Sequence, residues 1–189
     1  MEQVLVVQRS KIEQYISDKN GLITVGTDEL FNIIKREYEF MPRPEAEESP
    51  AFKQIIPYVI LRRDDEIFVT RRLNKGGEAR LHGKISIGIG GHINPVDDQG
   101  DMLMSGLWRE IHEEVELNTH GELSPCGFIN DDSNAVGSVH LGACFVLPVD
   151  GDVYVKEIEK LEGLWMTKKQ LMDNYDSMET WTQIAMEVI

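Results

Sequence analysis

The chain has 189 residues, enough for one domain of ordinary size with an appendage. Hydrophobic residues make up 41% of it and charged residues 28%, a composition that excludes wholesale disorder and predicts a folded globular protein. Acidic residues outnumber basic ones by 33 to 19, so the formal net charge is -14 and the average surface repels nucleic-acid backbones and anionic lipid. A phosphate-bearing ligand must therefore be bridged by a metal ion or met by a local basic patch.

The first 50 residues differ in texture from the rest. "QVLVVQR", residues 3–9, is rich in valine and predicts a buried strand. Helical patterns follow at "SKIEQYI" and at "TDELFNIIKREYEF", with Thr27 as the expected N-cap of the second helix. "MPRPEAEESP", residues 41–50, holds three prolines and predicts an irregular connector. We therefore divide the chain into an N-terminal extension, residues 1–50, and a main domain, residues 51–189.

From residue 54 onward, short β-branched runs alternate with turns. "QIIPYVILRR" and "IFVTRR" predict a hairpin around residues 64–66, and Pro57 indicates an edge position or a bulge in its first strand. "ISIGIGGHI" predicts a further strand, and so do "PCGFI", "SVHLGACFVLPV" and "DVYVKEI", the last two separated by a turn at Asp150-Gly151. With one long helical pattern at residues 102–117 and short ones near the end, these strands predict a layered α+β fold.

The central helical pattern gathers carboxylates on one side. At about 100° per residue, Glu110, Glu113 and Glu114 fall within an arc of roughly 100°, beside an apolar stripe. Like charges at this spacing repel one another by a few tenths of a kcal/mol, and a divalent cation among them removes that penalty. Carboxylate oxygens suit Mg²⁺ or Mn²⁺. Arg109, four residues before Glu113, can pair with it and fix its orientation.

These residues resemble a known motif. Gly90 and Gly91 followed by "REIHEEVEL" from Arg109 are similar to the Nudix box, Gly-x5-Glu-x7-Arg-Glu-U-x-Glu-Glu-x-Gly-U with U apolar. The resemblance implies an α/β/α sandwich with a mixed β-sheet, and hydrolysis of a diphosphate linkage in a nucleoside diphosphate derivative with Mg²⁺ or Mn²⁺. It implies catalytic roles for Arg109, Glu110, Glu113 and Glu114, the three glutamates being metal ligands together with the Gly91 carbonyl.

The chain departs from the motif at three places. Counted from Gly91 the early box glutamate falls on Asp97, and counted back from Arg109 it falls on Asp101, so the loop contains four extra residues. The glycine near the helix end is replaced by Glu116, and Asn118 is the residue that could adopt a left-handed conformation there instead. We expect these changes to alter the loop and the substrate fit more than the metal site.

Further candidates lie outside the motif. A basic stretch within residues 71–84 could bind substrate phosphates, or it could be an exposed loop with solubilising charge. The general base is expected to be Glu114, with Glu162 and Asp131 in reserve. We interpret His92, His112 and His140 as polar residues of the surface or core rather than ligands. The candidate substrate-binding residues in the basic stretch are Arg71, Arg72, Arg80 and Lys84.

Two other functions compete with hydrolysis. A ligand sensor with the same fold would bind a nucleotide without cleaving it, and would be expected to have lost box carboxylates that this chain keeps. A prenyl diphosphate isomerase would need a cysteine in a polar loop. Cys126 and Cys144 lie instead in apolar strand-like runs, where we expect reduced core thiols.

The expected partner is a small nucleotide-type diphosphate. Net charge disfavours nucleic acid except for a capped or triphosphorylated 5′ end. The N-terminal apolar run is too short for a signal peptide, and no stretch approaches the roughly 20 apolar residues of a membrane span, so we expect a soluble cytoplasmic protein. Residues 1–50 could cover an edge strand, shape the pocket or form a dimer interface, and of these we favour a homodimer.

Overall fold

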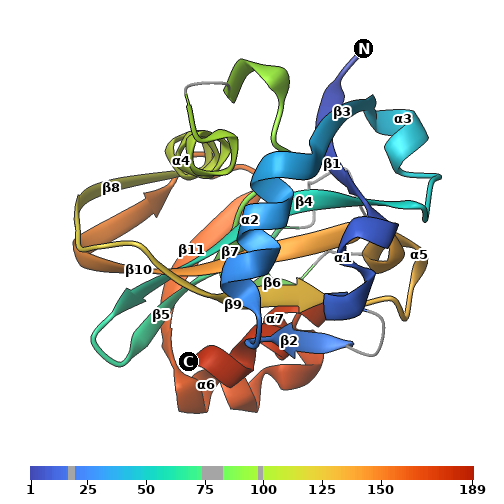
Figure 1. The fold of residues 1–189 in the computed structure, drawn as a ribbon. Helices are drawn as coiled ribbons and strands as arrows, with labels where there is room; N and C mark the ends of the chain where they lie inside the picture. The colour runs from blue at the N-terminus through green and yellow to red at the C-terminus, as the bar shows by residue number, and fades with distance from the viewer. Residues whose placement is uncertain (17–19, 74–82, 98–99) are drawn as a thin grey trace.

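A computed structural model describes residues 1–16, 20–73, 83–97 and 100–189 (Figure 1). The helices are α1 Arg9–Ile16, α2 Thr27–Glu37, α3 Arg43–Ala46, α4 Met102–Glu114, α5 Ala135–Ser138, α6 Lys168–Asp173 and α7 Thr180–Ala185. The strands are β1 Gln3–Gln8, β2 Gly21–Ile23, β3 Tyr38–Pro42, β4 Phe52–Arg63, β5 Glu66–Arg72, β6 Ile85–Ser86, β7 Gly88–Ile89, β8 Val115–His120, β9 Ser124–Asn130, β10 His140–Val155 and β11 Leu161–Thr167.

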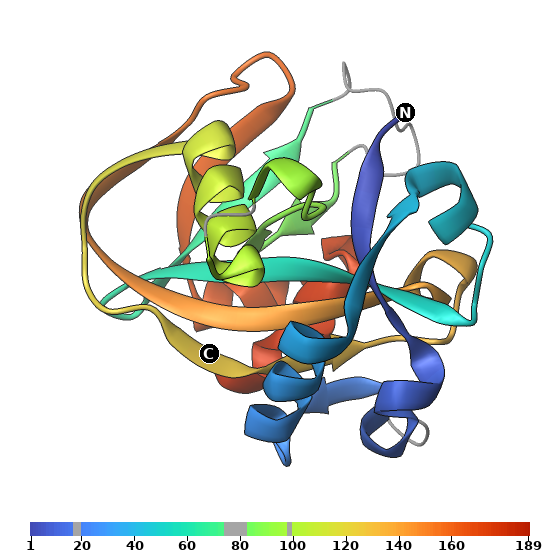
Figure 2. The ribbon, with the colours of Figure 1, turned by 45° about the horizontal axis from the view of Figure 1, so that its top comes forward.

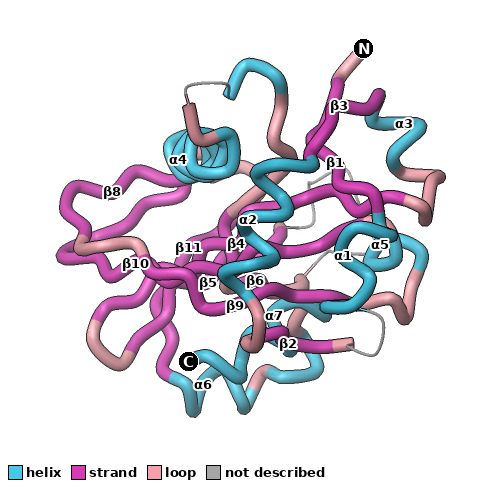
Figure 3. The backbone as a smooth tube through the Cα atoms, viewed as in Figure 1, coloured by secondary structure: helices cyan, strands magenta, loops and turns pink. Residues whose placement is uncertain are grey.

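The strands form one mixed sheet. Its main path runs β11-β5-β4-β10-β9-β2, and the central pair β4 and β10 is parallel, with His140 opposite Gln54 and Pro148 opposite Arg62. The other pairs are antiparallel, and the predicted hairpin between β4 and β5 is confirmed by the pairing of Arg63 with Glu66. The tube in Figure 3 shows the strands passing between two groups of helices.

Alternating side chains of β4 serve two cores on opposite faces of the sheet. Val59 and Leu61 belong to the core under α1, α2 and α4, whereas Tyr58 and Ile60 belong to the core under α6 and α7. In Figure 2, α2 and α4 lie in front of the sheet and the red C-terminal helices lie behind it. The predicted α+β sandwich with a mixed sheet is confirmed. Within the described part of the chain, no helix is long and apolar enough to cross a membrane.

The first 50 residues are built into the same sheet. Strand β1 pairs with β3 and with the first residues of β4, and β2 extends the far edge by pairing with β9. The segment 41–50 is not the irregular connector we expected, because it completes β3 and then forms α3. Its prolines fit this structure, since Pro42 ends the strand and Pro44 occupies the first turn of α3, where no backbone N–H is needed. The homodimer stays a prediction.

Three local predictions were wrong in detail. Thr27 is the first residue of α2 rather than its N-cap; Gly26 precedes the helix with a positive φ of 72°, and a side chain there would press on Tyr15. Asp150-Gly151 does not end a strand, because β10 continues through it with a shift of register before Val153. Pro57 lies inside a central strand, in the interval between the residues of β4 that pair with β1 and those that pair with β7.

A buried ion-pair cluster joins the first helix to the body of the domain. Lys53 of β4 is fully buried and donates to Oδ1 of Asp132 at 2.6 Å and to the carbonyls of Gly137 and His140. Arg9, at the start of α1, donates to Oδ2 of Asp132 at 2.6 Å. Burial by itself raises the pKa of Asp132, but hydrogen bonds from Arg9 and Lys53 outweigh it and lower that pKa below its ordinary value.

The cluster predicts an asymmetry between two variants. Asp132→Asn leaves the Lys53 charge buried without its carboxylate, a change that costs about 3–5 kcal/mol in a fully buried pair. We expect roughly 2–3 kcal/mol here, because the Asp132 side chain is 24% exposed. Lys53→Met removes the buried charge itself and leaves Asp132 paired with Arg9, so its loss should stay below roughly 2 kcal/mol. Urea unfolding at pH 7 measures both, and an equal or larger loss in Lys53→Met would contradict this account.

Candidate functional site

Helix α4 is fixed to the sheet along its apolar side. Leu103, Leu107 and Ile111 are buried in the core beneath it. The Asp101 side chain caps the first turn by accepting from the Met104 N–H at 3.2 Å. Gly106 allows close approach of the preceding loop, because a Cβ there would lie 2.9 Å from Cγ1 of Ile93. The polar residues of the last turns are therefore presented from a rigid support.

Arg109 lies at the centre of a hydrogen-bond network. Its Nε and Nη2 donate to the two carboxylate oxygens of Asp97, at 2.8 and 3.1 Å, and Nη2 also donates to the His92 carbonyl at 2.7 Å. Its Nη1 donates to Glu110 at 2.7 Å and to Glu113 at 3.2 Å. Hydrogen bonding to Asp97 is the largest cause of a raised pKa for Arg109, so the guanidinium is a permanent charge.

The geometry distinguishes the two aspartates that could replace the early box glutamate. Asp97 is buried, binds Arg109 in a bidentate manner and accepts from the Asn94 N–H at 2.8 Å. Asp101 caps α4 and forms a salt bridge with Lys35 at 2.8 Å. Asp97, the residue that the count from Gly91 gives, is therefore the aspartate that contacts Arg109.

Two of the three helix glutamates lie in surroundings that oppose their negative charge. Burial raises the pKa of Glu110, although Arg109 acts in the opposite direction. Burial also raises the pKa of Glu114 to about 7, and the charge of Glu110 adds to that effect. Glu113 is more exposed, with 60% of its side chain accessible. The local excess of negative charge is therefore not neutralised by Arg109 and the nearby Arg72.

This charge balance fits a hard divalent cation. Carboxylate oxygens are the donors that Mg²⁺ and Mn²⁺ prefer, and a cation would favour the ionised form of both Glu110 and Glu114. Gly91 lies directly against this group, since a Cβ at Gly91 would be 2.5 Å from Oε2 of Glu110. Because glycine has no side chain, the Glu110 carboxylate can lie next to the Gly91 backbone without a clash.

The residues predicted to bind substrate phosphates contact different parts of the structure. Arg71 lies 3.6 Å from Glu162, and Arg72 lies 3.4 Å from Glu179. The charges of Arg72 and Glu179 both act on Glu114, which places them near the helix carboxylates. Lys84 donates instead to the Asp176 carbonyl of the C-terminal segment at 2.9 Å. The fourth predicted residue, Arg80, lies outside the described residues.

The reserve bases are occupied elsewhere. Asp131 is buried and accepts from Ser133 and Asn134, which makes it part of a tight turn. Glu162 is exposed on β11 and pairs with Arg71. Among the three candidates for the general base, electrostatics favour Glu114, because it combines partial burial with a pKa near neutrality.

The end of α4 differs from the expectation drawn from the motif. Val115 caps the helix in an extended conformation with φ of -132°, and the chain enters β8 at once. Glu116 and Asn118 are strand residues, and Asp64 is the one non-glycine residue with positive φ among those described. The left-handed role proposed for Asn118 was therefore wrong. No glycine is needed at Glu116, because β8 pairs with β10 directly after the helix.

The histidines occupy surface and core positions, as the sequence indicated, but two of them lie side by side. His112 is exposed on α4, but the Nε2 atoms of His92 and His140 lie 3.4 Å apart, and His92 contacts Gln54 as well. The two histidines are 48 positions apart in sequence, so no local pattern could have linked them. Their proximity follows from the parallel pairing of β4 with β10, which places His140 opposite Gln54.

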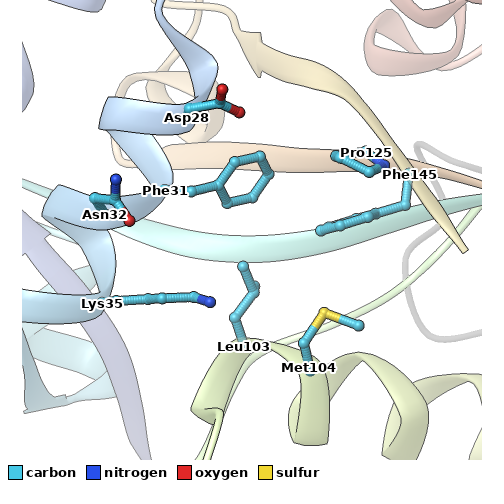
Figure 4. Close-up of a pocket in the computed structure, with 8 residues that line it drawn as sticks. All are labelled: Asp28, Phe31, Asn32, Lys35, Leu103, Met104, Pro125 and Phe145. Carbon is cyan, nitrogen blue, oxygen red and sulfur yellow. The ribbon is translucent and has the colours of Figure 1, made fainter.

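A cavity of about 360 Å³ lies beside the first half of α4 (Figure 4). Helix α2 of the N-terminal segment forms one wall and α4 another, and Figure 4 shows Phe31 and Phe145 facing each other across the apolar part. The described residues that line it do not include the three helix glutamates. Residues before position 50 thus line a cavity apart from the helix carboxylates, and a part for them in shaping the substrate pocket stays a prediction. The lining residues are Asp28, Phe31, Asn32, Lys35, Leu103, Met104, Pro125 and Phe145.

Comparison with known proteins identifies relatives of nearly full length. No protein-family profile matches the chain. The chain is 40% identical over 170 residues to protein YmaB of Bacillus subtilis (strain 168), a match that covers 85% of this chain and 82% of YmaB. The crystal structure of Tm1382, a proposed Nudix hydrolase, is 31% identical and superposes with a TM-score of 0.85 over 99% of this chain and 97% of Tm1382.

A more distant structure supports the fold alone. The Nudix domain of Shewanella oneidensis NrtR, solved with ADP ribose, superposes with a TM-score of 0.55 at 14% identity, covering 77% of this chain and 90% of that chain. The likeness to Tm1382 extends through residues 1–50 as well as the main domain, since it covers almost the whole of both chains. It confirms the family that the motif predicted: the chain belongs to the Nudix hydrolase family.

Proposed function

We propose that this protein hydrolyses the diphosphate linkage of a nucleoside diphosphate derivative with the help of Mg²⁺ or Mn²⁺. The observation that carries the proposal is the set of carboxylates on α4, which Arg109 orients from a buried contact with Asp97. Burial and repulsion between carboxylates raise the pKa of Glu110 and Glu114. Their negative charges are thus poorly compensated in the metal-free protein, and a cation would stabilise them.

The residues that would hold the cation are Glu110, Glu113, Glu114 and the Gly91 carbonyl. When bound, the metal neutralises charge on the diphosphate oxygens and makes a water molecule more acidic. Arg109 keeps Glu110 and Glu113 at fixed positions, because it donates to both from one guanidinium nitrogen. Asp97 has a positioning role, since it acts on the site through Arg109.

Glu114 is the proposed general base. Burial raises its pKa to about 7 in the metal-free protein, a bound cation would lower that value, and the ionised carboxylate would then take the proton of the acidified water. Arg72, whose charge acts on Glu114, could meet the phosphate that lies beyond the metal's reach, and Arg71 precedes it on the same strand. We retain Lys84 and Arg80 as further substrate-binding candidates.

Structural neighbours suggest the substrate class. One is a bifunctional NMN adenylyltransferase/ADP ribose pyrophosphatase of Francisella tularensis, solved with AMP and a Mn ion, which superposes with a TM-score of 0.55 at 11% identity. The NrtR domain was solved with ADP ribose. Both ligands contain an adenosine phosphate, so ADP-ribose and related nucleoside diphosphates are the first substrates to test.

The competing function is a sensor that binds such a ligand without cleaving it. The present chain keeps every carboxylate that the α4 site needs, which favours hydrolysis. A panel of nucleoside triphosphates, ADP-ribose, nucleotide sugars and dinucleoside polyphosphates distinguishes the two, with product release measured in Mg²⁺, in Mn²⁺ and in EDTA. If panel members raise the melting temperature but none is cleaved, the sensor replaces the hydrolase.

Glu113→Gln should abolish metal-dependent hydrolysis. It removes one ligand charge but leaves a side chain of the same size in an exposed position, so the fold should be unaffected. We expect kcat to fall by at least about a hundredfold, a loss of roughly 2.7 kcal/mol in transition-state stabilisation. The matched control is Glu116→Gln, which makes the same charge change on exposed β8 and should leave kcat within a few-fold of wild type.

A pair of loop variants tests which aspartate supports the site. Asp97→Asn weakens the bidentate contact to Arg109, and we expect kcat to fall at least about tenfold, because the carboxylate ligands lose their fixed support. Asp101→Asn makes the same charge change nearby but keeps an N-cap residue, so its kcat should remain near wild type. Steady-state kinetics at saturating Mg²⁺ decide the matter, and the reverse pattern would assign the box position to Asp101.

Glu114→Gln should stabilise the metal-free protein while removing its activity. The folded-state pKa of Glu114, about 7, lies above its ordinary value of 4.5, so the folded protein binds the proton more tightly than the unfolded chain does. Stability is therefore lost as pH rises from 4.5 to 7. In EDTA at pH 8 we expect the variant to melt roughly 2–4 °C above wild type.

At pH 4 the two proteins should melt close together, because Glu114 is then protonated in the folded protein and mostly protonated in the unfolded chain, and so is neutral like glutamine in both. Calorimetry at both pH values measures the difference, and Glu116→Gln again supplies the control. A Glu114→Gln enzyme that kept kcat within a few-fold of wild type would transfer the role of base to another carboxylate.

A further inference from the structure

A second group of metal-ligating side chains lies away from the carboxylates of α4. Among the described residues, Glu47, His92 and His140 each offer one ligand atom, and these atoms all lie within 4.8 Å of one another. They come from three parts of the chain: Glu47 directly follows α3, His92 lies in the loop after β7, and His140 begins β10. In Figure 1, α3 and the start of β4, which pairs with that end of β10, lie on the same side of the molecule.

The His140 imidazole is oriented as a ligand, with the nearest ring nitrogen of His92 beside it. His140 Nδ1 lies 2.7 Å from the Val136 carbonyl and must donate to it, so the lone pair of the neutral ring is on Nε2. That Nε2 lies 3.4 Å from Nε2 of His92. Two nitrogens that bind one tetrahedral Zn²⁺ at about 2.0–2.1 Å are about 3.3–3.4 Å apart. The pair therefore has the separation of a tetrahedral edge without any rearrangement of the backbone.

The neighbours of the group support binding. A carbonyl that accepts from the outer nitrogen of a ligand histidine fixes its tautomer, which is the part played by Val136. Oε1 of the buried Gln54 lies 2.9 Å from His92 Nε2 and accepts its proton in the metal-free protein, so a metal at Nε2 requires the His92 tautomer with its proton on Nδ1. Glu47 is exposed and contacts Arg43 at 3.4 Å, so its carboxylate can turn toward the histidines.

The donor set selects a different cation from that of α4. Imidazole nitrogens with one carboxylate suit Zn²⁺ and similar borderline ions, whereas the α4 group offers oxygen only. We propose that Glu47, His92 and His140 bind one Zn²⁺-like ion that joins α3 of the N-terminal segment to the strands of the main sheet. The site is separate from the catalytic carboxylates, although the His92 carbonyl accepts from Arg109.

The test is a titration of the full-length protein with Zn²⁺. Chelator-treated protein is titrated by calorimetry in excess Mg²⁺, which occupies the α4 carboxylates, and Co²⁺ is titrated in parallel because tetrahedral Co²⁺ absorbs visible light. We expect one ion per chain, the absorption of tetrahedral Co²⁺, and a rise in melting temperature with Zn²⁺. His140→Asn removes Nε2 but keeps a donor to Val136, and should weaken binding at least about tenfold.

Glu47→Gln should also weaken binding at least about tenfold, and as an exposed residue it cannot fail by unfolding. Glu48→Gln, the adjacent exposed residue, is the matched control and should bind as wild type does. Glu113→Gln should lose hydrolysis yet keep Zn²⁺ binding, so the failure of one site is distinguishable from that of the other. The proposal is overturned if wild type binds no Zn²⁺ at micromolar concentration, if Glu47→Gln or a folded His140→Asn binds normally, or if Glu113→Gln abolishes binding.

Discussion

The contact between Arg109 and Asp97 is the interaction on which the site depends. Asp97 is 3% exposed, and both of its oxygens accept from the guanidinium. The other donors of Arg109 reach Glu110, Glu113 and the His92 carbonyl. One planar group thereby fixes two carboxylates of α4 relative to the loop that follows β7, and a lysine, with a single point charge, could not bridge so many acceptors at defined angles.

This arrangement places negative charges close together on α4, where their repulsion lowers the stability of the fold. Glu114 and Glu110 repel each other from partly buried positions, and Arg109 is already engaged by Asp97. A carboxylate surrounded by solvent would be more favourable for the fold but less responsive to a cation. The metal-free protein is therefore less stable than its fold would allow, and a cation bound among these carboxylates would raise its free energy of unfolding.

Periodicity and spacing predicted the elements but not the contacts between them. The apolar stripe of Leu107 and Ile111 was enough to identify α4, and the glycine and arginine spacing located its carboxylates. The end of the helix at Glu114 could not be predicted, because the helical pattern of apolar residues continues into "VEL". Pairing with β10 makes these residues a strand instead. Residues 41–50 were misjudged since proline allows a strand end and a first helical turn as well as a coil. The proximity of His92 and His140 depends on the pairing of β10 with β4 and on the path of the loop after β7, neither of which a local pattern specifies.

The first helix and the strand after it contact residues far along the chain, which affects the order of folding. Arg9 and its partner Asp132 are separated by 123 positions, and β2 pairs with β9 at residues 128–130. During synthesis the first segment emerges from the ribosome long before the strand that will receive it. Contacts of such long sequence separation form slowly. For most of its translation the nascent chain therefore carries α1 and β2 without their partners at Asp132 and β9, and this is the period in which it is most exposed to aggregation and to chaperones.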